Sequence, residues 1–168
     1  KGFDRARLLQ QQPFVAELPF DSGRKRMSTL HQATEGRRQY SKGAPELLLD
    51  CCDRWHTGSG HVVPLTEEGR RQVLEAAHGM SRQALRVLAV AYSDQKTLAE
   101  QNLVFAGLLG LADPPRPGVG EAVASAAAAG IRTVMTSGDS LDTAVAIGRE
   151  LGILQPESLA LTGKELSA

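Results

Sequence analysis

Apolar and polar residues alternate in short runs over the first 105 residues, a pattern typical of half-buried β-strands. Two such runs flank Glu35-Gly36, which predicts a β-hairpin. Thr66 can cap a helix whose first turn carries Glu67 and Glu68. The expected strands are 14–20, 27–34, 37–42, 61–65 and 85–92, and the expected helices are 3–11, 45–52 and 66–80. These elements predict an α+β fold with a mainly antiparallel sheet.

A different pattern follows an apolar strand expected at residues 103–112. Pro114, Pro115 and Pro117 indicate a stiff connection, and an Ala-rich segment with helical spacing then runs to Gly130. The expected elements after it are a strand at 131–135, a helix at 141–151 and a strand at 159–161. Strands that alternate with helices favour a parallel α/β unit. We therefore predict two domains, 1–105 and 106–168.

Charge is unevenly distributed, although the formal net charge is zero. Residues 1–43 hold nine Lys and Arg against four Asp and Glu, and the remainder of the chain has the opposite excess. A basic first segment suits an anionic ligand, although surface hairpins also carry solvated Arg and Lys. Aromatic residues make up only 4% of the chain and do not alternate with basic ones, which argues against a nucleic-acid partner.

Several classes of protein are excluded by simple patterns. No apolar run approaches the roughly 20 residues that span a bilayer, and the N-terminus lacks the apolar core of a signal peptide. Cys51 and Cys52 are adjacent, so they form neither a disulfide framework nor a metal-ligand spacing, and we predict no metal site. The chain starts with Lys1 rather than methionine, and we expect it to be part of a longer protein.

The segment Lys42-Gly43-Ala44-Pro45-Glu46 is the most informative motif. It lies where an expected strand meets an expected helix. Gly43 permits a tight turn, Pro45 suits the first helical position, and Glu46 favours the positive end of the helix dipole. Lys42 is thereby fixed at a strand end. It is either a ligand-binding lysine or a solvated one.

Three further motifs occur along the chain, one before the Lys42 motif and two after it. They are Phe20-Asp21-Ser22-Gly23-Arg24-Lys25-Arg26-Met27, Asp113-Pro114-Pro115-Arg116 and Thr136-Ser137-Gly138-Asp139. Together the four resemble the cytoplasmic nucleotide-binding and phosphorylation domains of P-type cation-transporting ATPases, particularly the calcium-pump-like subfamily. The resemblance covers nearly the whole chain. It implies a nucleotide-binding domain without its first elements, joined to part of a Rossmann-like phosphorylation domain of the haloacid dehalogenase type.

The resemblance also assigns roles in ATP binding. It implies that Phe20 stacks on adenine and that Lys25 and Lys42, with Gly43, line the nucleotide pocket. Stacking on an exposed ring is worth roughly 1–3 kcal/mol, although Phe20 is equally compatible with a core position. Arg86 and Leu88 lie in an apolar strand. The resemblance implies that Arg86 reaches the phosphates and that Leu88 packs near the base, whereas an outward-facing edge arginine is the alternative.

Two polar segments in the second part have implied roles as well. Ser137, Gly138 and Asp139 lie between a strand and a helix, where free N–H groups bind oxyanions, although simple helix capping explains them equally well. The family usually has threonine where this chain has Ser137. Asp113 and Arg116 resemble the family's hinge residues, for which fixing the connection is as good an explanation as ligand contact.

The family's phosphorylated aspartate lies in an Asp-Lys-Thr-Gly-Thr run, which is absent from this sequence. The chain alone is therefore expected to bind ATP weakly, to hold no catalytic residue and to hydrolyse nothing. The parent protein would be an integral membrane enzyme that uses ATP and Mg²⁺. Its transmembrane and actuator domains would be the partners of this cytoplasmic fragment. Calcium as the transported ion is expected by resemblance only.

Two alternatives remain open at this point. One is a haloacid dehalogenase-type phosphatase with residues 1–105 as its cap, for which no nucleophilic aspartate at a strand end is found. The other is a non-catalytic nucleotide-sensing or interaction module. Flanking apolar segments of about 20 residues in the parent gene would favour the pump.

Overall fold

The computed structural model describes residues 4–166, which form two compact units. Within this range, the first unit comprises residues up to 74 together with 88–109, and the second comprises residues 75–87 and those from 110 onward. Three elements pass from one unit to the other, namely α3 (Glu67–Ser81), β6 (Leu85–Ser93) and β7 (Leu103–Ala112).

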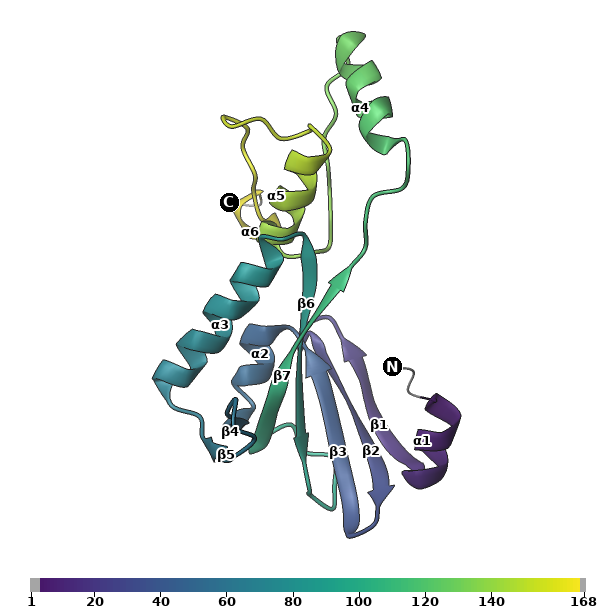
Figure 1. Ribbon diagram of the computed structural model, residues 1–168, viewed down its shortest axis with the longest axis vertical. Coiled ribbons are helices and arrows are strands. Elements are labelled where there is room, and N and C mark those ends of the chain that lie inside the picture. Colours follow the sequence, from purple (N-terminus) through teal and green to yellow (C-terminus); the bar gives the residue numbers. More distant parts are fainter. Residues whose placement is uncertain (1–3, 167–168) are drawn as a thin grey trace. The chain divides into compact units, whose positions relative to one another are not determined.

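A seven-stranded sheet in the order β1-β2-β3-β6-β7-β4-β5 forms the framework of the first unit (Figure 1). The remaining elements of this unit are α1 (Arg5–Gln11), β1 (Phe14–Asp21), β2 (Arg26–Ala33), β3 (Gly36–Gly43), α2 (Pro45–Leu49), β4 (Cys52–His56) and β5 (Val62–Pro64). The ladders from β1 through β3 to β6 and between β4 and β5 are antiparallel, whereas β4 and β7 are parallel. The sheet is thus mixed, with flanking helices, which is compatible with the α+β prediction.

The predicted hairpin is confirmed, with Ala33 opposite Gly36. Gly36 adopts a φ of 106°, a conformation that glycine tolerates best. The helix predicted for residues 45–52 is shorter, because it ends at Leu49 and Cys52 begins β4. A short apolar run is compatible with either a helix or a strand. From Cys52 onward, the hydrogen bonds to β7 make the segment a strand.

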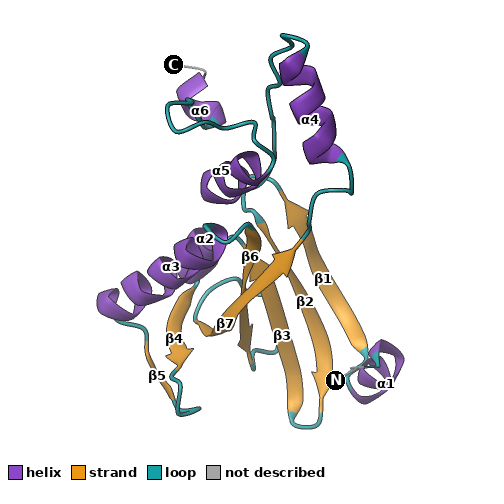
Figure 2. Ribbon diagram, turned by 45° about the horizontal axis from the view of Figure 1, so that its top comes forward, coloured by secondary structure: helices purple, strands orange, loops and turns teal. Residues whose placement is uncertain are grey.

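The core of this unit lies between one face of the sheet and two helices (Figure 2). Leu48 from α2 and Leu103 from β7 are completely buried, and Val73 from α3 joins the same cluster. Ala89 and Ala91 present the central strand β6 to this core. Alternation along the strands leaves the opposite side chains, including Lys42, on the other face of the sheet.

The second unit contains α4 (Val119–Ala128), α5 (Leu141–Glu150) and α6 (Gly163–Leu166). The helices predicted after the proline-rich segment and after Ser140 are confirmed. The strands predicted at 131–135 and 159–161 are wrong, since both segments lack regular structure. A strand requires a neighbour for its backbone groups, and no described strand pairs with either segment. The expected Rossmann-like unit is therefore not shown.

Candidate functional site

The junction between β3 and α2 has the local structure that its motif predicts. Lys42 is exposed near the end of β3, while Ser41 and Gly43 on either side of it are buried. Ala44 is the extended residue before the helix, and Pro45 occupies the first turn. Because Pro45 lacks an N–H group, it leaves no donor unsatisfied at this position.

Residues 20–25 comprise the last two residues of β1 and the turn into β2, and they carry two further predicted nucleotide contacts, Phe20 and Lys25. Phe20 is 64% exposed, so it is not the core phenylalanine that the sequence also allowed. The Asp21 side chain accepts a hydrogen bond from the Arg24 N–H at 2.8 Å, and the Asp21 carbonyl accepts one from the Lys25 N–H at 2.7 Å. Lys25 adopts a left-handed φ of 47°, which costs a non-glycine residue roughly 1 kcal/mol.

The turn and the junction are joined to each other. The Ala44 N–H donates to the Lys25 carbonyl at 3.0 Å, and Gly43 lies directly opposite Arg26 in the ladder. A Cβ on Gly43 would lie 2.5 Å from the Arg26 Cβ, so only glycine allows this approach. Lys25, in the turn just before β2, and Lys42, near the end of β3, are therefore held in neighbouring segments. Neither has an ion-pair partner within residues 4–166.

Leu88 completes the predicted set in this unit. Gly43 lies opposite Ala89 and Lys42 opposite Val90, so Leu88 is on the next strand at the same end of the ladder. Alternation places Leu88 and Lys42 on the same face of the sheet, and Leu88 is half-buried. The site thus combines two cations, an exposed aromatic ring and an apolar side chain.

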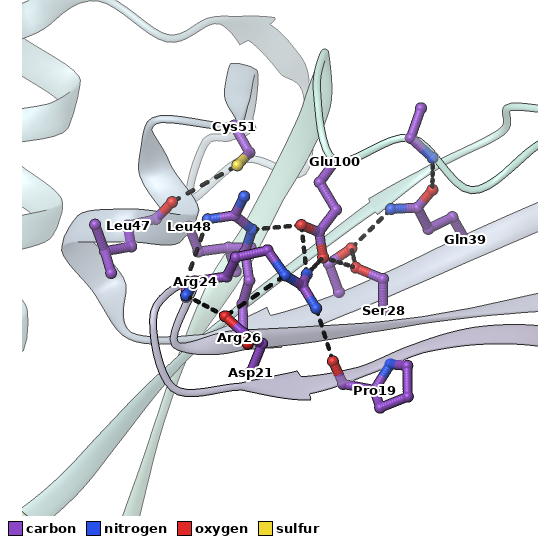
Figure 3. Close-up of polar contacts among 12 residues, drawn as sticks. Pro19, Asp21, Arg24, Arg26, Ser28, Gln39, Leu47, Leu48, Cys51 and Glu100 are labelled. Atoms are coloured by element: carbon purple, nitrogen blue, oxygen red, sulfur yellow. Dashed lines mark hydrogen bonds and ion pairs between the residues drawn. The ribbon is translucent and has the colours of Figure 1, made fainter.

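A buried carboxylate that sequence reasoning missed lies beside this site (Figure 3). Glu100, in the segment between β6 and β7, accepts hydrogen bonds from Arg24 Nη1 at 2.7 Å to both oxygens and from Arg26 Nε at 2.8 Å. The Ser28 hydroxyl donates to the same carboxylate at 2.9 Å. Glu100 lies outside helix and strand, so no periodicity singled it out. In the sequence, the available signal was an acidic residue in the same predicted domain as the basic cluster of residues 24–26.

Opposing effects set the ionisation of Glu100. Burial raises the pKa of its carboxyl, but hydrogen bonds from Arg24, Ser28 and Arg26 together outweigh burial and lower that pKa below its ordinary value. The Arg24 guanidinium has a raised pKa, chiefly because of its hydrogen bond to Glu100. The two arginines that flank Lys25 are thus held by this carboxylate.

A polar network extends from Glu100 into the sheet. The Ser28 and Ser41 hydroxyls lie 2.7 Å apart, and Gln39 Nε2 donates to Ser41 at 3.0 Å. Gln39 Oε1 accepts from the Ala99 N–H at 2.9 Å, which fixes the backbone next to Glu100. Ser28, Gln39 and Ser41 are almost completely buried, and each has a partner, so the network orders this region rather than destabilising it.

The other predicted site residues belong to the second unit. Arg86 is exposed, and its Nε donates to Asp139 at 2.6 Å. The Ser137 hydroxyl also donates to Asp139, at 3.0 Å, and these bonds lower the pKa of the Asp139 carboxyl, with Arg86 as the main cause. Gly138 completes this turn. The helix cap itself is Ser140, which accepts from the Thr143 N–H.

Asp113 and Arg116 lie in the irregular segment between β7 and α4, and both are exposed. The Arg116 carbonyl accepts a hydrogen bond from Val119 at 3.3 Å. Across the described residues, no group of three His, Cys, Asp or Glu side chains could hold a metal ion. Nor does the described part of the chain contain a helix that is long and apolar enough to cross a membrane.

Comparison with known proteins gives consistent matches. Residues 2–118 match the family model of the P-type ATPase cytoplasmic domain N. Calcium-transporting ATPase 1 of Bacillus cereus is 44% identical over 90% of the chain, and calcium-transporting ATPase lmo0841 of Listeria monocytogenes is 42% identical over 90%. A probable plasma membrane-type calcium-transporting ATPase of rice is 36% identical over 89%. The chain spans less than a fifth of the length of these three relatives.

Proposed function

The chain belongs to the P-type ATPase family, whose cytoplasmic N domain it matches over most of its length, and we propose that it binds ATP. The adenine ring stacks on Phe20, and the phosphates are neutralised by Lys25 and Lys42. Leu88 packs near the base. Gly43 contributes by allowing the end of β3 to approach the backbone of Lys25 and Arg26 closely.

One observation carries this proposal. The Lys25 carbonyl accepts a hydrogen bond from the Ala44 N–H, which joins the segments of two lysines that have no ion-pair partners in the described residues. Phe20, an exposed aromatic residue, lies at the end of β1 that leads into the turn of Lys25. Lysine is a compact cation that suits phosphate, and an aromatic face suits a base. A nucleotide presents both groups in one molecule.

We further propose that the longer protein is a membrane pump that transports calcium, as the names of its relatives state for those proteins. ATP held here would be presented to an aspartate that this chain lacks, so the chain alone binds without hydrolysis. Phosphoryl transfer depends mainly on positioning and charge neutralisation, which is the contribution that a separate binding domain makes.

Residues 106–168 are proposed to be part of the phosphorylation domain, with its haloacid dehalogenase-type fold completed by other parts of the pump. Ser137, Gly138 and Asp139 would then contact the phosphoryl group, and Asp113 and Arg116 would belong to the hinge. Arg86 would exchange its ion pair with Asp139 for a nucleotide phosphate. Mg²⁺ would accompany ATP in the intact pump.

Calorimetric titration of the chain with ATP tests the proposal. Phe20→Ala should weaken binding roughly 5- to 100-fold, which corresponds to the loss of one stacking contact. Lys42→Ala should weaken it about tenfold through the loss of one phosphate contact. Phe14→Ala and Lys96→Ala are the matched controls, since both residues are exposed and outside the site. Absence of saturable binding by the wild type, or equal losses in the controls, would refute the proposal.

A further inference from the structure

Glu100 is a charged side chain with no direct place in the proposed ATP contacts. Its side chain is only 9% exposed, and its carboxylate accepts hydrogen bonds from Arg24, Arg26 and Ser28. A buried charge with this many donors is well compensated, and removing the carboxylate leaves its donors unsatisfied. Two of these donors, Arg24 and Arg26, lie on either side of Lys25 in the sequence.

Arg24 links Glu100 to the backbone next to Phe20. Arg24 Nη1 donates to Glu100, while Nη2 donates to the Pro19 carbonyl at 2.8 Å (Figure 3). Pro19 immediately precedes Phe20. The planar guanidinium therefore connects the Glu100 carboxylate to the end of β1 where the exposed ring is attached.

Arg26 provides a second link on the other side of the turn. It immediately follows Lys25, and its Nε donates to the second Glu100 oxygen at 2.8 Å. Lys25 between the two arginines has the unfavourable φ of 47°. Such a conformation persists only where the surrounding structure fixes it, and here Glu100 contacts the residue on each side.

We infer that Glu100 is a positioning residue for the nucleotide, and this inference rests on the proposed ATP site. It acts through Arg24 and Arg26 to hold residues 20–25, at the end of β1 and in the turn that follows, in the conformation that presents Phe20 and Lys25 together. It does not touch the ligand. The hydrogen bond from the Ala99 N–H to the Gln39 side chain anchors the backbone next to the carboxylate.

Charge alone predicts the opposite effect, which makes the inference testable. Glu100 is an anion in the neighbourhood of a proposed polyanion site, so its neutralisation should strengthen ATP binding if long-range attraction were its only influence. Loss of positioning should weaken binding instead. The sign of the change in affinity for Glu100→Gln separates the two effects.

The experiment compares Glu100→Gln, Arg24→Gln and the double variant by calorimetric titration with ATP. Each single variant should weaken binding about tenfold. The double variant should be no weaker than either single one, because both break the same link. Glu67→Gln is the matched control, since it removes the same charge from a side chain that is 96% exposed, and it should leave affinity unchanged. Arg24→Gln keeps the test valid if Glu100→Gln does not fold.

Amide hydrogen exchange supplies a second, ligand-free readout. The Lys25 and Ala44 N–H groups, which bond across the turn and junction, should exchange faster in Glu100→Gln, while those of the central strand β6 are unchanged. Equal or tighter ATP binding, additive losses in the double variant, or unchanged exchange at both amides would overturn the inference. If the wild type binds no ATP, the proposed function fails, and the exchange data still decide whether Glu100 fixes the turn.

Discussion

The two units of this chain use apolar residues in different ways. In the sheet unit, Leu48 and Leu103 are completely buried, whereas Ile131, Val134 and Leu159 in the second unit are 62%, 75% and 78% exposed. Every strand of the first unit has a neighbour within the chain. The comparison shows that the same kind of apolar pattern yields a strand only where a partner strand is available to satisfy its backbone.

Leu48→Ala should have the largest effect on stability. The side chain is fully buried in the core of the sheet unit, and its removal leaves a cavity there. We expect the free energy of unfolding to fall by about 2–5 kcal/mol in chemical denaturation. A loss well under 1 kcal/mol would mean that this core does not determine the stability of the unit.

Gly43→Ala should be nearly as damaging, for a different reason. The new methyl group would lie 2.5 Å from the Arg26 Cβ and 2.6 Å from the Lys25 carbonyl oxygen. Overpacking of this kind destabilises by about 1–3 kcal/mol. Gly58→Ala is the control, because nothing lies within 4 Å of its added methyl group. Equal effects of the two substitutions in thermal or chemical unfolding would contradict the close approach.

The carboxylate of Glu100 should make the stability of the sheet unit dependent on pH. Its pKa is lower in the folded chain, so its contribution is complete above the unfolded value of about 4.3 and is lost as pH falls through the folded pKa. The wild type should exceed Glu100→Gln in unfolding free energy by about 1 kcal/mol at neutral pH. That difference should shrink in acid. A difference that is constant from neutral to strongly acidic solution would argue against an ionised Glu100.

Val134→Ala should have the smallest effect, and it completes the comparison with Leu48→Ala. The side chain is 75% exposed and lies outside regular structure, so its truncation should change the unfolding free energy by less than about 0.5 kcal/mol. Circular dichroism melts of the chain are sufficient to measure this. A loss comparable to that of Leu48→Ala would show that Val134 is packed in solution.

Much of the sheet unit was predictable from sequence, because its signals are local. Alternation around Glu35-Gly36 predicted the hairpin, and the motif at Lys42 predicted the strand–helix junction. The resemblance to P-type ATPases is confirmed at the level of the family. The roles of the individual site residues and the domain boundary at residue 105 remain predictions.

Other features depend on contacts that no local pattern contains. The strand at Cys52 exists because β7 pairs with it. The predicted strand at Ile131 is missing because none of the described strands pairs with that segment. Glu100 reaches Arg24 from 76 residues away in sequence, through a segment without helix or strand. Such long-range partners become visible only in the folded structure.

The central claim is that ATP binds where residues 20–25, at the end of β1 and in the turn that follows, meet the β3–α2 junction. The most direct test is to record backbone amide spectra of the isotope-labelled chain during titration with ATP. We predict saturable shifts that are largest at Phe20, Lys25 and Lys42. Shifts confined to the second unit, or no saturable shifts at all, would contradict the account.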